Sequence, residues 1–505
     1  MFRPHPFGGP DALRAGRGGL LSRRGLLDGK RVYLETMGCQ MNVLDSELVL
    51  GMLRSLGYEP VDDHAQADLV LLNTCSVRRH AEDKVYSRLG EIARDGSARP
   101  GRIIGVIGCM AERDHAGLLA RAPFIDLLCG PGRLDEIPAL IAEAQAARRP
   151  AVALEQGRGR RIPRARRMHE PDGIEALDMS RRPAADRPAV QAYVRVQRGC
   201  DKFCSFCVVP YTRGPERSRP PAHIVEEVRR LVDGGVREIT LLGQTVNSYH
   251  FDEAGRTVRF ADLLERVHAV PGLDRLRFVT SYPGDFDDDI FHAMRCLPRV
   301  CGYLHIPAQS GSDAVLRRMR RQYTAGQYLE LLARARELVP GISLAGDFIV
   351  GFCGETEEDH AATLALVERA AYKSLFMFMY SPRPDTAADR RLVDDVPAEV
   401  KRRRHAELAA LQRRMSLRHH RAFIGREVEI LVEGYSKAAR RARAGARPGA
   451  RASWPRPDQL TGRTPGDEIV VFSGPASLIG RTVRIRITGA TALTLHGEPV
   501  EPPVT

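Results

Sequence analysis

The sequence predicts an α/β protein of three domains: an open parallel α/β domain, a partial (β/α)6 barrel and a small all-β barrel. Three observations support this fold class. Three apolar runs near the amino terminus each lead to a cysteine, six more apolar runs alternate with helical patterns, and short alternating strands with glycine turns follow residue 425. Strands that alternate with helices are typical of parallel sheets, and closely spaced alternating strands are typical of small barrels.

We expect the first domain to span residues 30–150, after a disordered extension at residues 1–29 that is rich in glycine and arginine. Its strand-like runs are residues 30–36, 68–73 and 102–107, and they are followed by Cys39, Cys75 and Cys109. The carboxyl ends of strands in an open parallel sheet converge on one crevice, where such sheets bind ligands. The three cysteines therefore predict a cluster site at this edge. Cys129 follows a similar run and is an alternative ligand.

A polar stretch at residues 151–187 breaks the periodicity, so we expect a linker there. The second domain follows at residues 188–422, with strand-like runs at residues 192–197, 238–243, 277–280, 302–306, 342–350 and 374–379. Active sites of α/β barrels lie at the carboxyl ends of the strands. This rule predicts that the cofactor contacts at the mouth of the barrel are Gly243, Gln244, Gln309, Ser310, Asp347 and Gly351.

Cys200, Cys204 and Cys207 are separated by three and two residues, a spacing that places three thiolates on three corners of one 4Fe-4S cube. This spacing resembles the radical S-adenosylmethionine (SAM) signature, in which the fourth iron binds SAM. A zinc site would need a fourth ligand nearby, and none precedes Cys296 except His223, which falls in a helical pattern. Ten cysteines in 505 residues are also too sparse for a disulfide scaffold.

Longer motifs around these cysteines resemble the methylthiotransferase family. They are Met37-Gly-Cys-Gln-Met-Asn42, Asn73-Thr-Cys-Ser-Val77, Gly108-Cys-Met-Ala-Glu112 and the run from Gly199 to Gly214. Cys39-Gln-Met-Asn42 is closer to the branch that modifies tRNA than to the branch that modifies a ribosomal protein, for which a Pro-Lys pair is expected in place of Gln-Met. Thr245, Tyr282 and Cys353 depart from the family pattern.

This resemblance implies conversion of N6-isopentenyladenosine, next to the anticodon in tRNA, to its 2-methylthio derivative. It implies two 4Fe-4S clusters, one on Cys200, Cys204 and Cys207 and one on Cys39, Cys75 and Cys109. Two SAM molecules would supply the methyl group and the radical, and a flavodoxin- or ferredoxin-type reductant and a sulfur donor would serve as partners. The alternatives are a methylthiotransferase acting on a ribosomal protein or on another modified tRNA adenosine, and an iron-sulfur RNA-binding sensor without catalysis.

Residues 423–505, including Leu460-Thr-Gly-Arg-Thr464, resemble the TRAM domain, an RNA-binding module, with a basic insertion near residues 438–455. The chain carries a net charge of +13, and basic surfaces bind phosphate backbones irrespective of sequence. We therefore expect tRNA as a partner. The sequence contains no apolar run long enough for a membrane span, so we expect a cytoplasmic monomer.

Overall fold

The computed structural model describes residues 29–76, 79–94, 101–147, 149–155, 172–181, 189–443 and 458–500. These residues form two compact units, of which the first comprises Met1–Gly157 with Pro171–Arg181 and the second comprises the remainder. The extension predicted at residues 1–29 lies outside the described residues except for residue 29.

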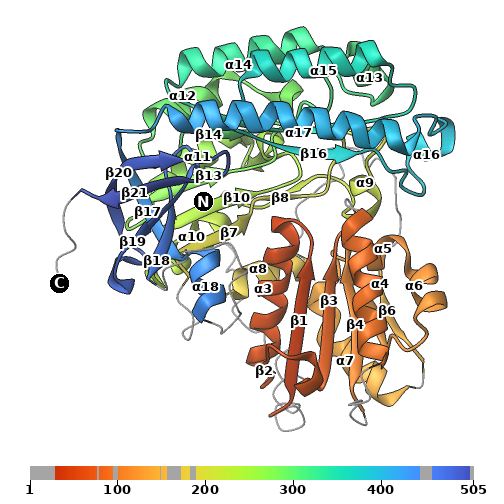
Figure 1. Ribbon diagram of the computed structural model, residues 1–505. Helices are drawn as coiled ribbons and strands as arrows, with labels where there is room; N and C mark the ends of the chain where they lie inside the picture. Colours follow the sequence, from red (N-terminus) through yellow and green to blue (C-terminus); the bar gives the residue numbers. More distant parts are fainter. Residues whose placement is uncertain are drawn as a thin grey trace, which may run out of the picture. The chain divides into compact units, whose positions relative to one another are not determined.

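A parallel sheet forms the centre of the first unit, and its described strands are ordered β2-β1-β3-β4-β5-β6 (Figure 1). The strands are β1 (Arg31–Met37), β2 (Glu59–Pro60), β3 (Leu69–Thr74), β4 (Ile103–Gly108), β5 (Leu127–Cys129) and β6 (Ala151–Ala153). The helices are α3 (Gln40–Ser55), η2 (His64–Gln66), α4 (Arg79–Arg94), α5 (Cys109–Arg113), α6 (His115–Arg121), η3 (Leu134–Glu136), α7 (Ile137–Ala146) and α8 (Gly173–Ser180). All six residues of β3 are buried, as expected for a central parallel strand that is covered on both faces.

Two parts of the stretch predicted to be a linker form regular structure in the first unit. β6 pairs with β5 through Leu127 and Ala151, and α8 contacts α3 and η3. The side chain of Asp172 caps α8 by accepting a hydrogen bond from the amide of Glu175 at 3.1 Å. The linker prediction is therefore wrong for these two segments, and residues 156–171 and 182–188 lie outside the described residues.

The second unit contains the six strands of the predicted partial barrel, which are β7 (Gln191–Arg195), β10 (Glu238–Leu242), β13 (Arg275–Phe278), β14 (Tyr303–His305), β15 (Ser343–Val350) and β16 (Ser374–Met379). They form two parallel sheets, β13-β10-β7 and β14-β15-β16, and a bridge between Leu276 and Val300 connects β13 to the segment before β14. The alternation of strand-like and helical patterns in the sequence therefore predicted the six strands correctly.

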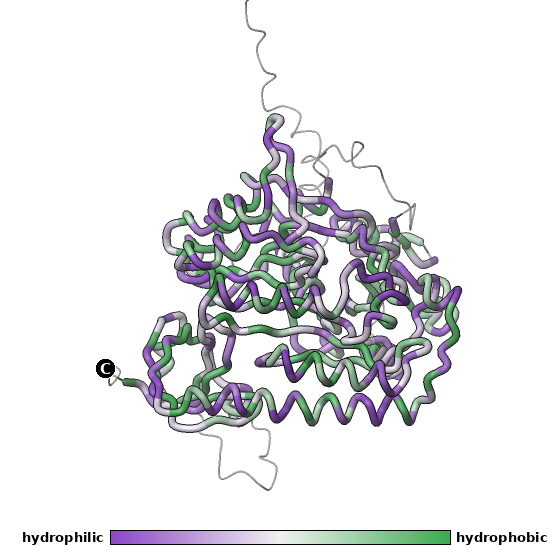
Figure 2. The backbone as a smooth tube through the Cα atoms, turned by 90° about the horizontal axis from the view of Figure 1, so that it is seen from above, coloured by the Kyte–Doolittle hydropathy of each residue, from purple (hydrophilic) through white to green (hydrophobic). Residues whose placement is uncertain are grey.

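The helices of the barrel are α9 (Val209–Thr212), α10 (Pro221–Asp233), η5 (Val246–Ser248), α11 (Phe260–His268), η6 (Pro283–Asp285), α12 (Asp288–Cys296), α13 (Asp313–Arg318), α14 (Ala325–Leu338), α15 (Glu357–Ala370), α16 (Ala387–Arg391) and α17 (Ala398–Arg421). Short antiparallel pairs add β8 (Gln197–Arg198) with β9 (Arg217–Ser218) and β11 (His250–Glu253) with β12 (Arg256–Arg259). Hydrophobic and hydrophilic residues alternate along the helices in Figure 2, as expected for helices with one buried face.

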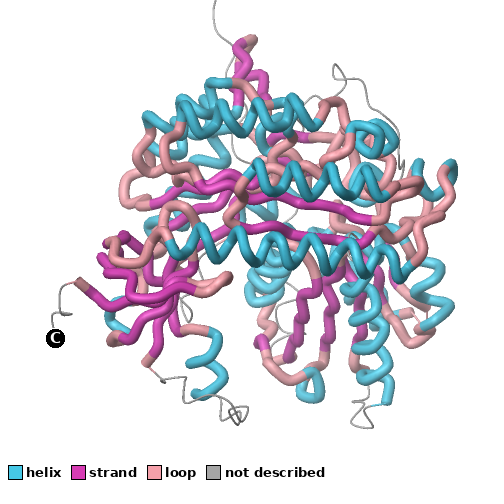
Figure 3. The backbone as a smooth tube through the Cα atoms, turned by 45° about the horizontal axis from the view of Figure 1, so that its top comes forward, coloured by secondary structure: helices cyan, strands magenta, loops and turns pink. Residues whose placement is uncertain are grey.

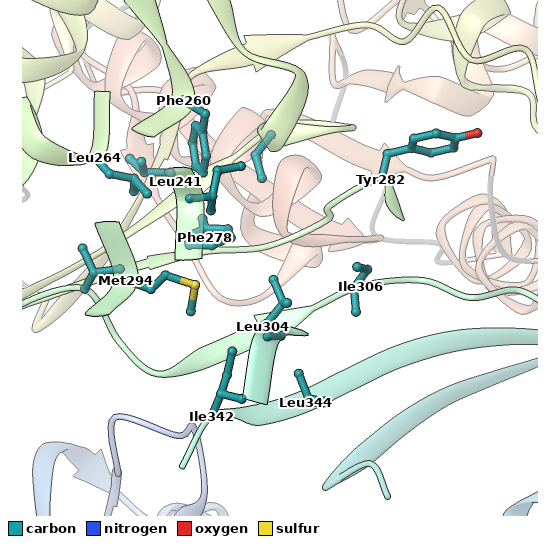
Figure 4. Close-up of a cluster of buried hydrophobic side chains, with 14 of the residues drawn as sticks. Leu241, Phe260, Leu264, Phe278, Tyr282, Met294, Leu304, Ile306, Ile342 and Leu344 are labelled. Atoms are coloured by element: carbon teal, nitrogen blue, oxygen red, sulfur yellow. The ribbon is translucent and has the colours of Figure 1, made fainter. Parts of the chain in front are cut away.

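Alternate residues of the barrel strands pack against these helices. Figure 4 shows part of this core, where Leu241, Phe278, Leu304 and Leu344 from four strands lie with side chains from α11 and α12. The rings of Phe260 and Phe278 meet edge to face at 5.1 Å. Side chains one position along each strand point to the opposite face, because successive residues of a strand alternate.

The carboxyl-terminal part of the second unit is a closed barrel with the strand order β17-β18-β19-β21-β20 (Figure 3). Its elements are β17 (Glu427–Tyr435), α18 (Lys437–Arg443), β18 (Gln459–Arg463), β19 (Ile469–Ser473), η7 (Ala476–Leu478), β20 (Thr482–Ala490) and β21 (Leu495–Pro499). α18 occupies the start of the predicted basic insertion, and residues 444–457 lie outside the described residues. None of the helices in the described ranges has the length and hydrophobicity that a bilayer crossing requires.

Candidate functional site

Cys39, Cys75 and Cys109 lie at the carboxyl ends of three adjacent strands of the first unit. Met37 of β1 is in register with Thr74 of β3, and Thr74 is in register with Gly108 of β4. The amide of Cys75 donates a hydrogen bond to the carbonyl of Met37 at 3.1 Å. The sheet therefore brings three cysteines that are far apart in sequence to one edge.

Two of these cysteines also lie at the amino-terminal ends of helices. Cys39 is the residue that precedes α3, and Cys109 is the first residue of α5. The free amide groups at the start of a helix favour negative charge, as carried by thiolates. This position suits cysteines that bind iron as thiolates.

A buried pair of asparagines connects the loops that carry Cys39 and Cys75. The Nδ2 of Asn42 donates to Oδ1 of Asn73 at 2.9 Å, and the Nδ2 of Asn73 donates to the carbonyl of Asn42 at 2.9 Å. The amide nitrogen and the thiol of Cys39 both donate to Oδ1 of Asn42 at 3.3 Å. Sequence reasoning read these asparagines only as parts of motifs, whereas the structure shows that they fix the relative positions of the cysteine loops.

Gly108 is required at the third strand end. Its φ of 94° lies in the left-handed region, and a Cβ at this position would meet Oδ1 of Asn73 at 2.5 Å and the carbonyl of Thr74 at 2.7 Å. Any larger residue would push the β4 end away from β3. The glycine before Cys109 therefore keeps the neighbouring strand ends close.

Cys129, the alternative ligand, ends the next strand, in register with Ile107 of β4. Its thiol donates to the carbonyl of Arg133 at 3.1 Å. Burial, with a further contribution from Glu136, raises the pKa of this thiol well above its ordinary value. Because the Cys129 thiol is already engaged by the carbonyl of Arg133, we retain the other three cysteines as the predicted ligands.

The loop with Cys200, Cys204 and Cys207 follows β8 in the second unit. The amide of Cys200 donates to the carbonyl of Gly214 at 3.1 Å, and the amide of Cys207 donates to the carbonyl of Cys204 at 3.0 Å. Gly199 has a φ of 74°, and a Cβ there would lie 1.9 Å from the carbonyl oxygen of Pro215. The chain therefore turns tightly directly before the first cysteine.

Neighbouring elements hold the middle of this loop. The amide and the hydroxyl of Ser205 donate to the carbonyls of Met319 and Arg318, at 3.0 Å and 2.7 Å. The carbonyl of Ser205 accepts a hydrogen bond from the amide of Ala388 at 2.7 Å. The loop is thus fixed by the residues after α13 and by α16.

A cationic and aromatic cluster lies beside Cys204. The Nη1 of Arg321 is 3.3 Å from the sulfur of Cys204, and its guanidinium lies 4.5 Å from the ring centroid of Tyr282. The ammonium group of Lys202 lies 4.9 Å from the centroid of the same ring and forms an ion pair with Asp285. Arg321 thus places a positive charge beside a sulfur that is predicted to bind iron. Arg321 was not identified from the sequence, because it lies 114 positions beyond Cys207 in a segment without a motif.

The donor set of this loop fits an iron-sulfur cluster. Burial raises the pKa of Cys200 well above its ordinary value, and the neighbouring Cys207 adds to the effect, so the Cys200 thiol keeps its proton unless a metal takes its place. Within the described ranges, no three Cys, His, Asp or Glu side chains are arranged as a finished metal-binding group. The six cysteines therefore remain predicted ligands on the basis of their loops, strand ends and spacing.

Five of the six residues predicted to contact SAM lie in the segments that follow β10, β14 and β15, whereas Asp347 lies within β15. Gly243 and Gln244 follow β10, and Oε1 of Gln244 is buried without a hydrogen-bond partner. The hydroxyl of Ser310 lies 3.3 Å from that of Thr363 and accepts from the amide of Ser312 at 3.2 Å. The hydroxyl of Ser310 thus stabilises its own loop.

The remaining residues predicted to contact SAM are Gln309, Asp347 and Gly351, and each has hydrogen-bond partners within the barrel. Gln309 has a φ of 75°, and its amide donates to the carbonyl of Asp347 at 2.8 Å. The carboxylate of Asp347 pairs with Nε2 of His305 at 2.9 Å. Gly351 has a φ of 69°, and its amide donates to Glu355 at 2.8 Å. No observation tests the predicted contacts of these residues with SAM.

Sequence reasoning missed Gln197, which directly precedes the cysteine loop. Its side chain is completely buried, and neither Nε2 nor Oε1 has a hydrogen-bond partner. Its Oε1 lies near Gly243, at 3.4 Å from the position that a Cβ would take there. Ser281, after β13, carries a third buried oxygen without a partner. Buried polar groups normally have partners, so these groups at the strand ends fit a polar ligand.

A six-stranded α/β barrel with a C-x3-C-x2-C loop at the mouth defines the radical SAM class of enzymes. Residues 194–367 match the Radical SAM superfamily, residues 31–130 match the Uncharacterized protein family UPF0004, and residues 451–500 match the TRAM domain. These matches confirm the predicted fold class of all three domains.

Comparison with curated proteins identifies the family within this class. The chain is 46% identical to a tRNA-2-methylthio-N(6)-dimethylallyladenosine synthase of Rhodopirellula baltica, over 93% of this chain and 95% of the relative. It is 44% identical to a protein of the same name from Moorella thermoacetica, over 94% of this chain and 99% of that relative. The chain belongs to the tRNA-2-methylthio-N(6)-dimethylallyladenosine synthase family. The resemblance to the tRNA branch of the methylthiotransferases is thereby confirmed.

Among solved structures, the chain is similar to the radical S-adenosylmethionine methyltransferase TsrM from Kitasatospora setae, whose structure contains cobalamin and a [4Fe-4S] cluster. The two chains are 17% identical, the match covers 71% of this chain and 77% of the other, and the TM-score is 0.48.

Proposed function

We propose that this protein replaces the C2 hydrogen of an N6-dimethylallyladenosine next to the anticodon of tRNA with a methylthio group. The presence of two cysteine sets in two different compact units carries this conclusion. One set has radical SAM spacing in a barrel, and the other lies at three adjacent strand ends. An enzyme that only generates a radical needs one cluster, whereas transfer of a methylthio group also needs a source of sulfur, which a cluster on the second cysteine set would provide.

Two 4Fe-4S clusters and SAM are the cofactors of this reaction. When bound, they supply one-electron reduction and a radical that is able to replace an unactivated C–H bond, which acid-base catalysis does not achieve. Cys200, Cys204 and Cys207 would hold the first cluster, and Cys39, Cys75 and Cys109 would hold the second. Arg321 keeps positive charge beside Cys204, and the Asn42–Asn73 pair keeps the loops of the second set together.

The carboxyl-terminal barrel supports tRNA as the substrate. It matches the TRAM domain, and α18 presents Lys437 and the arginines Arg440, Arg441 and Arg443. A basic surface of this kind binds phosphates, so recognition of the single base falls to the α/β barrel. We further propose a flavodoxin- or ferredoxin-type reductant, a sulfur donor for the second cluster, and a monomer that works in the cytoplasm.

Mass spectrometry of tRNA nucleosides from a deletion strain tests this function. We expect the 2-methylthio nucleoside to disappear and N6-dimethylallyladenosine to accumulate. The wild-type gene and a Cys296→Ala variant should restore the product, because Cys296 is exposed and belongs to neither cysteine set, whereas Cys200→Ala should not. Unchanged nucleosides, together with loss of a methylthio group from a ribosomal protein, would assign the chain to the protein-modifying branch. Loss of a different methylthio adenosine would change the substrate within tRNA.

A further inference from the structure

One face of the sheet β14-β15-β16 is not used by the helix-packed core. Leu304, Leu344 and Leu375 from the three strands belong to that core. Because side chains alternate along a strand, His305, Asp347 and Phe376 point to the opposite face. Phe348 of β15 also belongs to that core, so its neighbours Asp347 and Ile349 point to the opposite face.

His305, Asp347 and Phe376 contact one another on this face, although His305 is in register with Ala345 and reaches Asp347 diagonally. Asp347 is in register with Phe376 on the neighbouring strand. The Nε2 of His305 lies 2.9 Å from Oδ1 of Asp347, and the rings of His305 and Phe376 meet edge to face at 5.8 Å with an interplanar angle of 76°. The three side chains thus combine a polar pair with an aromatic ring in a fixed arrangement.

Phe376 is 48% exposed although it lies in the middle of a strand. The next row toward the carboxyl end continues the apolar surface, since Ile349 and Phe378 are in register and both are half-buried. Ile349 packs against an apolar cluster against which Phe206 of the cysteine loop also packs. The aromatic surface, defined as Phe376, Phe378 and Ile349, therefore borders the radical site.

Several unpartnered polar atoms and the aromatic surface belong to the two different sheets of the barrel. Gln197, Gln244 and Ser281, which lie beyond the carboxyl ends of β7, β10 and β13, each carry a buried polar atom without a partner. The aromatic surface lies on β15 and β16. A ligand with a polar part and an apolar tail would place its polar edges on the first side and its tail on the second. Burying that tail against the exposed ring of Phe376 is favourable by about 0.8 kcal/mol per methylene.

We propose that the aromatic surface contacts the dimethylallyl group of the substrate adenosine and makes the enzyme selective for the prenylated base. This inference rests on the proposed function, which supplies a substrate with a branched five-carbon tail on N6. The adenine ring of SAM is the other aromatic or apolar group that the reaction brings to the barrel. SAM carries charged groups and a polar purine edge, so the unpartnered polar atoms suit it better than the aromatic surface does.

Binding of two labelled anticodon stem-loop RNAs tests the proposal without turnover. The two RNAs are identical except that one carries N6-dimethylallyladenosine and the other carries adenosine. We expect the wild-type holoenzyme to bind the prenylated RNA about tenfold more tightly, and Phe376→Ala to abolish most of that ratio by weakening only the prenylated RNA. Phe376→Leu, which keeps an apolar side chain, should retain part of the ratio and serves if Phe376→Ala fails to fold.

Met379→Ala is a matched control, because Met379 is 46% exposed and lies on the same strand but on the opposite face. It should leave the binding ratio unchanged. An unchanged ratio in folded Phe376→Ala would overturn the proposal. So would weaker SAM binding with an intact RNA ratio, which would assign the surface to SAM. If the wild type prefers the prenylated RNA but no methylthio product forms, the proposed function fails while this assignment of the surface stands.

Discussion

The ammonium group of Lys373 lies 2.9 Å from the carboxylate of Asp467, and both side chains are largely buried. Lys373 directly precedes β16, whereas Asp467 lies in the turn between β18 and β19. The hydroxyl of Ser343 donates to Glu468 at 2.7 Å, and Arg277 donates to the carbonyl of Thr464 at 2.6 Å. The carboxyl-terminal barrel is therefore attached to the amino-terminal ends of the α/β strands, at the end opposite the cysteine loop.

Breaking this ion pair should destabilise the second unit. Removing one partner of a buried pair leaves the other charge uncompensated, so Lys373→Met should cost about 3–5 kcal/mol of unfolding free energy. The double variant Lys373→Met with Asp467→Asn should recover part of the loss, because neither charge is then left buried alone. Urea unfolding monitored by circular dichroism measures both.

The control is the exposed pair Arg334–Asp288, at 2.7 Å with side chains 41% and 49% exposed. Surface pairs contribute about 0–1 kcal/mol, so Arg334→Gln should have a small effect. Equal losses in Lys373→Met and Arg334→Gln would contradict a stabilising role for the buried pair. This attachment also means that deletion of the carboxyl-terminal barrel would expose charged groups of the α/β barrel, so such a truncation is not a clean test of tRNA binding.

The same interface should make stability depend on pH in the acid range. Burial alone would raise the pKa of Asp467 and Glu468, but nearby positive charges and hydrogen bonds to the carboxylates outweigh it, so the pKa of each carboxyl lies below its ordinary value. Lys373 acts on both, Arg463 and Arg277 act on Asp467, and His419 acts on Glu468. The unfolded carboxyls titrate near pH 4, with pKa values of about 3.9 and 4.3. Their stabilisation is therefore fully present above that pH and is lost as the pH falls below it.

Thermal unfolding between pH 7 and pH 3 measures this effect. The unfolding temperature of the wild type should fall steeply below about pH 4, while Asp467→Asn should start lower and fall less. Parallel curves for the two proteins would show that Asp467 does not contribute to the acid sensitivity.

The cysteine sites could be predicted from sequence because each has a strong local signal, whereas other features depend on distant residues. Cys39, Cys75 and Cys109 follow apolar runs, and parallel pairing then places them at one edge. Asp467, by contrast, lies in a Pro-Gly-Asp turn that reads as exposed, and only docking of the barrel buries it. β6 has three residues, too few for a periodic pattern.

The exposure of Phe376 was equally invisible in the sequence. The run from Ser374 to Met379 is apolar throughout, as expected for a strand buried on both faces, and its bounds were predicted correctly. Which of its side chains stay exposed depends on the neighbours of β16, namely β15 on one side and α17 packed against the strand. Such long-range neighbours are not encoded in the local pattern.

Iron content should separate the two cysteine sets. Two 4Fe-4S clusters correspond to about eight iron atoms per chain after anaerobic reconstitution. The triple variant with Cys39, Cys75 and Cys109 changed to alanine should retain about four. Cys129→Ser is the control and should keep the full content, since the thiol of Cys129 already donates to the carbonyl of Arg133 at 3.1 Å. Full iron in the triple variant together with a loss in Cys129→Ser would move the second cluster toward β5.

The two sets should also separate by activity. Cys200→Ala should abolish both reductive cleavage of SAM and methylthiolation, because the radical site loses one of three ligands. Cys75→Ala should abolish methylthiolation and spare the cleavage of SAM to 5′-deoxyadenosine, because Cys200, Cys204 and Cys207 lie in the other compact unit. Both products are measured in one reaction by chromatography and mass spectrometry. The remaining cluster of each variant is first confirmed by absorbance and iron content, so that misfolding is not mistaken for a lost function. Methylthiolated tRNA from correctly folded Cys75→Ala protein would show that the strand-end cysteines do not deliver the sulfur.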